Sequence, residues 1–296
     1  MKYRDPKGGA RTPARDLAGG LAAALVFDGE KAMAFITEDQ LARWHVSFDD
    51  ALAIAVNNLK TKSMGRFKQL APGLYASPWR DNYDAARLLL PGAFAGLALR
   101  GKPVVTVPNR DTLLVTGSED LKALGVLASA TEQAVQEPRP ISAVPLVQEG
   151  ATWRAFIPAA PQELRERYRG MLLGAQSSDY ADQKELLDEA YQRSGTDLFV
   201  ASFKAVQGPK TGGVVSYCTW TNGADSLLPR TDFVIFMDGD EKNMHIAASA
   251  PWARVEKVVG ARLKPQGLTP ERFRAATFPS DEEIRALGFA AEFPRP

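Results

Sequence analysis

The chain has 296 residues, of which 45% are hydrophobic and 24% are charged, a balance that is typical of globular proteins and excludes a largely disordered chain. It has 36 Lys and Arg and 35 Asp and Glu, which gives a net charge of +1. The chain therefore lacks the excess of basic residues that binding to nucleic acid requires. One cysteine and two histidines exclude an internal disulfide framework and a His-rich metal site, and they favour a reducing cytoplasm.

The length favours two domains over one. We expect a flexible leader over residues 1–20, a first domain over residues 21–158 and a second domain over residues 159–296. The apolar stretch at residues 17–27 is too short to span a bilayer, and Asp16 interrupts the basic flank that a signal peptide would carry. The sequence therefore predicts neither membrane insertion nor secretion.

Turn and capping residues mark the elements of the first half. In chain order, these are a hairpin over residues 25–36 with its turn at Asp28 and Gly29, a helix in a capping box from Thr37, a helix over residues 48–59 capped by Ser47, a strand over residues 74–77, a helix from Asp81 to near Pro91, a hairpin over residues 104–116, a helix over residues 118–136 and a hairpin over residues 141–157.

The second half opens with two predicted helices, over residues 161–173 and 178–193, the latter ended by Gly195. Four strands follow, over residues 198–206, 214–220, 233–237 and 245–249, and three helices close the chain, over residues 251–259, 269–275 and 280–287. This order predicts an α+β protein whose two domains are built from antiparallel hairpin sheets packed with helices.

A short signature of the form Pro-x-x-Asp, followed by an apolar run, occurs twice, at residues 108–115 and 229–236. A tight turn that leads into a buried strand has this pattern. Its recurrence suggests a distant internal repeat that relates the two halves.

Five segments of the first half carry a resemblance to a known family. They are LVFD at residues 25–28, ITEDQLARW at 36–44, AVNNL at 55–59, DNYDAARLL at 81–89 and VPNRDTLLV at 107–115. In this order, the segments resemble the YtpQ-like family of uncharacterised bacterial proteins over about residues 22–158. Since that family has no established activity, the resemblance implies a bacterial cytoplasmic protein and no particular chemistry.

The richest polar cluster predicted from the sequence is Asp81, Asp84, Arg87, Arg110 and Asp111. Asp84 and Arg87 are three positions apart and can pair on one helix face, while the turn that holds Arg110 can lie against the start of that helix. Such a cluster can bind an anion or run acid–base chemistry. In the structural alternative, which we favour, Asp81 caps, Asp84 pairs with Arg87, and Asp111 orders its own turn.

Other motifs point to no cofactor and no metal. Cys218 lies within a β-rich run, which favours a buried structural cysteine over a reactive one. The segment from Asp238 is similar to a calcium loop, but Lys242 stands where an oxygen ligand is required. The glycine pairs lack the residues of a phosphate-binding loop.

These observations favour a non-enzymatic cytoplasmic module of the accessory or immunity type that binds a protein partner, with neither nucleic acid nor membrane as a partner. The alternative is an enzyme or a small-anion-binding protein that uses the Asp/Arg cluster of the first domain.

Overall fold

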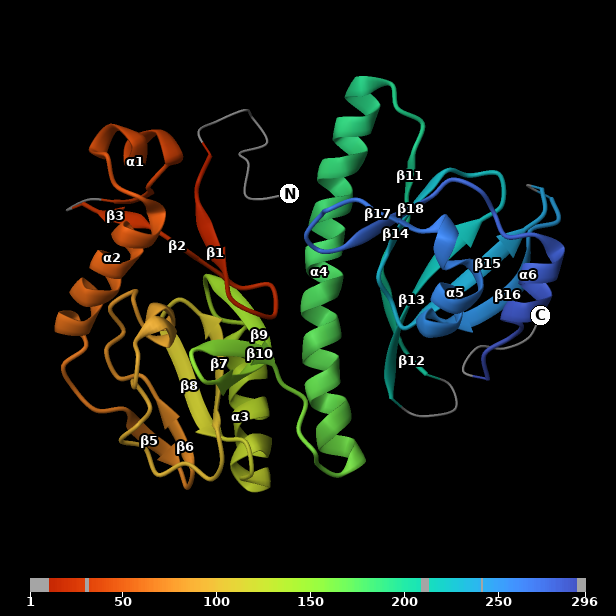
Figure 1. Ribbon diagram of the computed structural model, residues 1–296. Helices are drawn as coiled ribbons and strands as arrows, with labels where there is room; N and C mark the ends of the chain where they lie inside the picture. The colour runs from red at the N-terminus through yellow and green to blue at the C-terminus, as the bar shows by residue number, and fades with distance from the viewer. Residues whose placement is uncertain (1–10, 30–31, 209–212, 241, 292–296) are drawn as a thin grey trace. The chain divides into compact units, whose positions relative to one another are not determined.

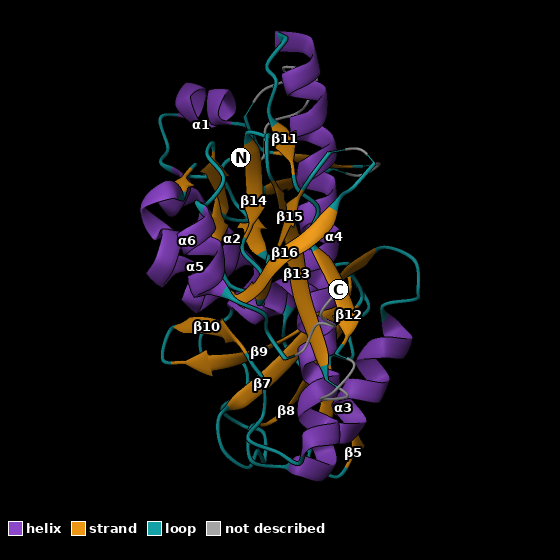
Figure 2. Ribbon diagram, turned by 90° about the vertical axis from the view of Figure 1, so that its right-hand side faces the viewer, coloured by secondary structure: helices purple, strands orange, loops and turns teal. Residues whose placement is uncertain are grey.

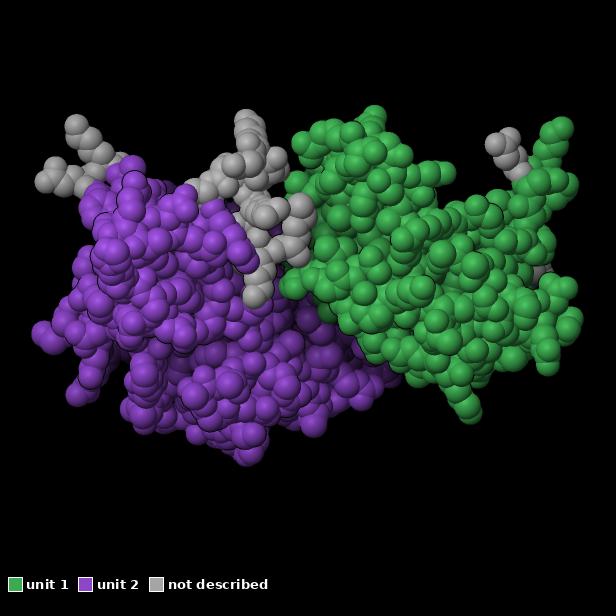
Figure 3. Space-filling view, turned by 45° about the horizontal axis from the view of Figure 1, so that its top comes forward, with its two compact units in different colours: residues 1, 176–296 green, residues 2–175 purple. Residues whose placement is uncertain are grey.

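The computed structural model describes residues 11–29, 32–208, 213–240 and 242–291, and it has the α+β class that the sequence predicts (Figure 1). The chain divides into two compact units between Ala175 and Gln176, inside helix α4 (Gln162–Ser194). We call them the N-terminal unit (residues 2–175) and the C-terminal unit (residues 176–296), and Figure 3 colours them separately. Among the described residues, no helix combines the length and the apolar character needed to cross a membrane.

A six-stranded antiparallel sheet forms the centre of the N-terminal unit. Its order is β10-β9-β7-β8-β6-β5, with β5 (Lys68–Ala71), β6 (Leu74–Ala76), β7 (Pro103–Asn109), β8 (Thr112–Gly117), β9 (Pro140–Glu149) and β10 (Thr152–Ala155). Helix α3 (Leu121–Ala134) and the first half of α4 cover the face that holds Val104, and Leu124 and Tyr168 are buried there. Since side chains alternate along β7, Val105 lies in the core on the opposite face.

A smaller group of elements precedes this sheet. It contains the strand pairs β1 (Ala14–Asp16) with β2 (Ala22–Ala24) and β3 (Val26–Asp28) with β4 (Met33–Phe35), and the helices α1 (Glu38–Trp44) and α2 (Phe48–Lys62). The structure confirms the capping box of Thr37 at the start of α1 and the Ser47 cap of α2. Leu25, Leu41 and Leu52 form the buried centre of this group.

The N-terminal unit differs from the prediction in three places. Residues 1–10 of the expected leader lie outside the described residues, and residues 11–20 are structured because β1 pairs with β2. Asp28 pairs with Met33 inside the strands, so Asp28 and Gly29 do not form a two-residue turn.

The helix expected from Asp81 is only a short 3-10 helix, η1 (Ala85–Leu89). The backbone at Arg80 and Asn82 has φ values of 48° and 66°, which no right-handed helix adopts. The Asp81 side chain does not cap a helix: its carboxylate binds Arg87 and accepts a hydrogen bond from the Tyr83 amide at 3.1 Å, before η1 begins at Ala85.

The C-terminal unit contains two four-stranded sheets, and Figure 2 labels six of their strands, β11 to β16. One has the order β11-β14-β18-β17, with β11 (Phe199–Val200), β14 (Ser226–Pro229), β17 (Lys264–Pro265) and β18 (Arg272–Ala275); the other has the order β12-β13-β15-β16, with β12 (Lys204–Gln207), β13 (Val214–Thr221), β15 (Phe233–Asp238) and β16 (His245–Pro251). Helix α5 (Trp252–Val259), the 3-10 helix η2 (Gly260–Arg262) and helix α6 (Asp281–Leu287) complete the unit, and Trp220, Phe236 and Val255 lie in its core.

Several predictions for this half are wrong. The two helices expected over residues 161–193 are one helix, because residues 174–177 contain no Pro and the backbone at Gly174 stays helical. The strand expected over residues 198–206 is divided between β11 and β12, which belong to different sheets. The helix expected over residues 269–275 is replaced by β18, whose pairing with β14 outweighs its local helical pattern.

The two Pro-x-x-Asp turns have different structures. The first joins β7 to β8 as an antiparallel hairpin, as predicted. The second leads from β14 in one sheet to β15 in the other, and β15 then pairs in parallel with β13. The second half is therefore not built from antiparallel hairpins alone, and the shared signature marks two turns of different topology.

Candidate functional site

Arg87 is the centre of the predicted polar cluster, and only 1% of it is exposed. Its Nη1 and Nη2 atoms donate to the two carboxylate oxygens of Asp81 at 2.8 and 2.7 Å. Its Nε donates to Ser63 Oγ at 2.9 Å, and Nη2 also donates to the Lys62 carbonyl at 3.2 Å. The guanidinium lies 4.1 Å from the ring centroid of Trp79. All three nitrogens of Arg87 are thus engaged within the protein.

Asp81 faces Arg87 from the loop that precedes η1. The left-handed backbone at Arg80 and Asn82 turns this loop so that the Asp81 carboxylate meets the guanidinium. The hydrogen bonds from Arg87 hold the pKa of Asp81 below its ordinary value, while partial burial acts in the opposite direction. Asp81 is therefore an ionised partner of Arg87 at neutral pH.

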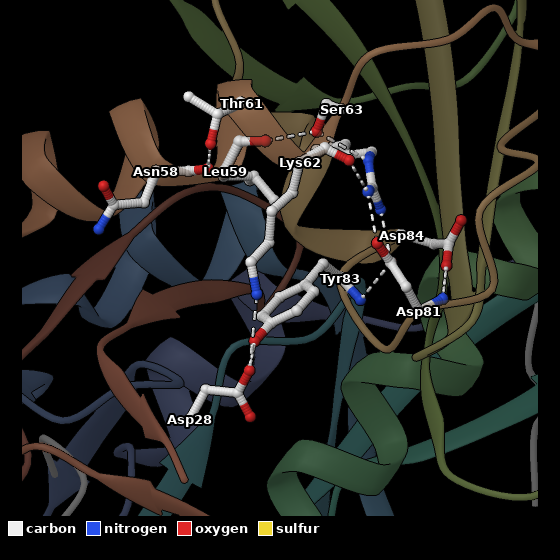
Figure 4. A network of polar contacts seen from close by, with 10 residues as sticks. Asp28, Asn58, Leu59, Thr61, Lys62, Ser63, Asp81, Tyr83 and Asp84 are labelled. Atoms are coloured by element: carbon white, nitrogen blue, oxygen red, sulfur yellow. Dashed lines mark hydrogen bonds and ion pairs between the residues drawn. The ribbon is translucent and has the colours of Figure 1, made fainter. Parts of the chain in front are cut away.

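Asp84 is completely buried beside this pair. Its Oδ2 accepts a hydrogen bond from the Asp81 amide at 3.2 Å, so that it fixes the loop rather than pairing with Arg87 as the sequence suggested. Its Oδ1 has no hydrogen-bond partner in the described part of the chain. Figure 4 shows this oxygen on the side of the carboxylate that faces away from Asp81.

Of the other two predicted residues, only Arg110 contacts this segment, and it does so through its backbone. The Arg110 carbonyl accepts a hydrogen bond from the Ala85 amide at 3.4 Å. The Asp111 amide donates to Asn109 Oδ1 at 3.0 Å, so Asn109 orders the turn in the role that was expected of Asp111. The structure thus brings together Asp81, Asp84 and Arg87, and leaves the side chains of Arg110 and Asp111 outside their network.

A second part of this network was not predicted. Tyr83 donates from its hydroxyl to Asp28 Oδ2, and Lys62 Nζ lies 3.7 Å from the same carboxylate oxygen and 4.8 Å from the Tyr83 ring centroid (Figure 4). Burial, together with the bond to Asp28, raises the pKa of Tyr83 to about 12. Tyr83 therefore stays protonated at neutral pH and is a poor base or nucleophile.

The C-terminal unit contains a second buried guanidinium, that of Arg272, which is not among the site residues predicted from the sequence. It has no carboxylate partner among the described residues and donates only to neutral oxygens. These are Gln183 Oε1 at 2.6 Å and the carbonyls of Ala201 at 2.7 Å, Leu227 at 3.1 Å and Tyr180 at 3.2 Å. Burial lowers the pKa of Arg272 to about 10. Gln183 lies 89 positions away in the chain, and no local motif signals this contact.

Two further predictions concern reactive or metal-binding groups. Cys218 is buried, as expected, and burial raises the pKa of its thiol to about 12. The amides of Lys242 and Asn243 donate to Asp240 Oδ1 in the loop that was compared with a calcium site, and Glu241 lies outside the described residues. In the described ranges, no group of three or more His, Cys, Asp or Glu is placed to hold a metal ion.

Comparison with known proteins adds no relative: family models, curated proteins and solved structures each give no match to this chain. The resemblance of about residues 22–158 to the YtpQ-like family therefore stays a prediction from sequence motifs.

Proposed function

We propose that this chain is a non-enzymatic protein-binding module of the bacterial cytoplasm, of the accessory or immunity type, and that its docking surface is the hairpin β3–β4 with the neighbouring helices α1 and α2. The observation that supports it is the exposure of Phe27 and Phe35, each 62%. We call these two phenylalanines, with Trp44 and Ile54, the aromatic surface.

The hairpin exposes apolar side chains on both of its faces. Phe35 lies opposite Val26, and Phe27 lies opposite Ala34, so the two phenylalanines project to opposite sides. Trp44 on α1 and Ile54 on α2 are also more than half exposed. A two-stranded sheet is marginal by itself in water, so a partner that covers both phenylalanines would stabilise it and bury apolar area.

The occupant that we propose is a protein with an apolar surface of its own. Aromatic side chains are enriched among the residues that dominate binding energy at protein interfaces. The enzyme or anion-binding alternative is second because all three nitrogens of Arg87 already donate within the protein. The cytoplasmic setting is supported by the single cysteine, which is buried and unpaired.

The test is a comparison of three forms of the full chain in affinity capture from a bacterial cytoplasmic extract. The double variant Phe27→Ser/Phe35→Ser is expected to lower the yield of the captured partner about tenfold or more. The control is Val126→Ser, which changes an exposed apolar residue on α3 outside the aromatic surface. Circular dichroism checks that each form is folded.

Two outcomes would contradict the proposal. One is a stoichiometric partner that the double variant captures as well as the wild type does. The other is the absence of any stoichiometric partner for the wild type. Light scattering on the purified chain reveals whether the partner is a second copy, in which case the double variant is monomeric and the wild type is not.

A further inference from the structure

A groove of about 490 Å³ lies on the C-terminal unit, between the second half of α4 and the segment that joins β11 to β12. Figure 1 shows β12 running beside α4, and Figure 2 shows the same neighbours from the side. From α4, the lining includes Tyr180, Glu185 and Glu189; from the opposite bank, it includes Ser202 and Phe203. The described residues that line the groove all belong to the C-terminal unit.

The floor of the groove is aromatic. The rings of Tyr180 and Phe203 stack with their centroids 5.0 Å apart and their planes inclined by 13°. Arg272 restrains Tyr180, because its guanidinium lies 5.1 Å from the centroid of the Tyr180 ring and donates a hydrogen bond to the Tyr180 carbonyl. A rigid apolar floor of this kind accepts an apolar side chain at little entropic cost.

The bank opposite α4 presents unpaired main chain. Ala201 donates its amide to Leu227, and Lys204 begins the ladder with Tyr217, but the amides and carbonyls of Ser202 and Phe203 have no hydrogen-bond partner in the described ranges. The Phe203 residue is buried, with 7% of it exposed, although its main chain lacks these partners among the described residues. Unpaired main-chain groups beside an apolar groove are the means by which proteins recognise extended peptides.

The α4 bank of the groove is acidic. Asp188 is neutralised by Lys184, whose Nζ lies 2.8 Å from its carboxylate. Glu185 and Glu189, one helical turn apart, have no ion-pair partner within the part of the chain that is described. Like charges at this spacing destabilise a helix, and a cationic ligand would relieve the repulsion. Lys204 is the remaining basic residue of the lining and lies on the opposite bank.

We propose that this groove binds an extended segment of a partner protein that carries alternating apolar and basic residues. The segment hydrogen-bonds through its main chain to Ser202 and Phe203, places an apolar side chain over Tyr180 and Phe203, and directs a basic side chain to Glu185 and Glu189. The aromatic surface is in the other unit, so each proposal can fail without the other.

The probe for this groove is a fluorescein-labelled peptide of alternating valine and lysine, titrated into the full chain and followed by fluorescence anisotropy. Saturable binding that weakens with salt is expected for this peptide and not for its valine–glutamate counterpart. Glu185→Gln/Glu189→Gln is expected to weaken binding about three- to tenfold. Asp182→Asn, an acidic position on α4 outside the groove, is the matched control, and Lys204→Glu is expected to strengthen binding.

Amide hydrogen exchange tests the main-chain contacts directly, because non-specific attraction between the basic peptide and the acidic helix would not protect the Ser202 and Phe203 amides. Without peptide, the Ser202 and Phe203 amides exchange quickly, and with the valine–lysine peptide they are expected to slow about tenfold or more. The proposal is overturned if the peptide shows no saturable binding up to about 1 mM. It is also overturned if Asp182→Asn weakens binding as much as the double variant does, or if exchange at both amides is unchanged.

Discussion

Arg87 in the N-terminal unit and Arg272 in the C-terminal unit are both at most 1% exposed, yet among the described residues only Arg87 has a carboxylate partner. Arg87 forms a two-point contact with Asp81, which is itself one-third exposed. Arg272 instead distributes its donors over a glutamine side chain and three carbonyl oxygens of the main chain.

The difference concerns what each arginine organises. The hydrogen-bond partners of Arg87 are close to it in the sequence, within residues 62–87. Arg87 therefore fixes a local loop. Arg272 donates hydrogen bonds to α4, to the chain after β11 and to β14. Neutral oxygens from these three segments therefore stabilise its positive charge. A buried charge without a counter-ion is tolerated only when all of its donors are satisfied. We therefore expect the C-terminal unit to depend on Arg272 more than the N-terminal unit depends on Arg87.

The largest effect is expected for Arg272→Ala. The variant leaves Gln183 Oε1 and the Ala201 carbonyl without their donor and opens a cavity, so the free energy of unfolding of the C-terminal unit should fall by about 3–5 kcal/mol. Urea unfolding followed by hydrogen exchange of peptides from residues 176–291 measures it. The control is Arg274→Ala in the same strand, whose side chain is half exposed and pairs with Asp225. Equal losses in the two variants would contradict the central role of Arg272.

The next effect is expected for Asp81→Asn, which turns Arg87 into a buried arginine without a carboxylate. The side chain of Asn has one acceptor oxygen and one NH2 group, so one of the two Arg87 nitrogens that bind Asp81 would face a donor instead of an acceptor. The free energy of unfolding of the N-terminal unit should therefore fall by about 2 kcal/mol. Partial exposure of Asp81 keeps this loss below that of a fully buried pair. Asp111→Asn is the matched control, and a loss as large as that of Asp81→Asn would show that the effect is not specific to the pair.

The sequence predicted the parts of the fold that depend on local chemistry. The capping residues Thr37, Ser47 and Ser280 begin α1, α2 and α6, and the first Pro-x-x-Asp turn forms its hairpin. What it could not predict depends on distant partners. β18 forms where local signals favoured a helix, because its residues pair with β14, more than 40 positions earlier in the chain.

The candidate site shows the same limit. The sequence grouped Asp81, Asp84 and Arg87 correctly, since they lie within one turn-rich segment. It assigned Arg110 and Asp111 to the group from their nearness to a turn, but side-chain direction depends on the hairpin register, and only the Arg110 backbone makes contact. Asp28 was not included because its contact with Tyr83 spans 55 positions.

The contrast between the two arginines should also depend on acidity. The folded-state pKa of Asp81 is below its unfolded value of about 3.9, so its contribution is complete above that value and is lost as pH falls through the lower folded pKa. Arg272 bonds to neutral oxygens and, in the described ranges, has no carboxylate partner that could be protonated. The stability difference between wild type and Asp81→Asn should therefore shrink below pH of about 4, whereas the difference between wild type and Arg272→Ala should not shrink in parallel. Urea unfolding at a series of acidic pH values measures both differences.

The smallest effect is expected for Tyr83→Phe, which removes one hydrogen bond at the edge of the Arg87 network and leaves the Arg87–Asp81 contact in place. A loss of about 1 kcal/mol at neutral pH is expected, smaller than that of Asp81→Asn. Because the folded pKa of Tyr83 is raised to about 12, its contribution is complete below the unfolded value of about 10 and is lost as pH rises toward 12. The difference in free energy of unfolding between the wild type and Tyr83→Phe, measured by urea unfolding, should thus decrease over this pH range. In an ultraviolet titration of the folded protein, the variant should show one fewer tyrosine that ionises at high pH. A variant as unstable as Asp81→Asn would mean that Tyr83, and not the ion pair, holds this loop.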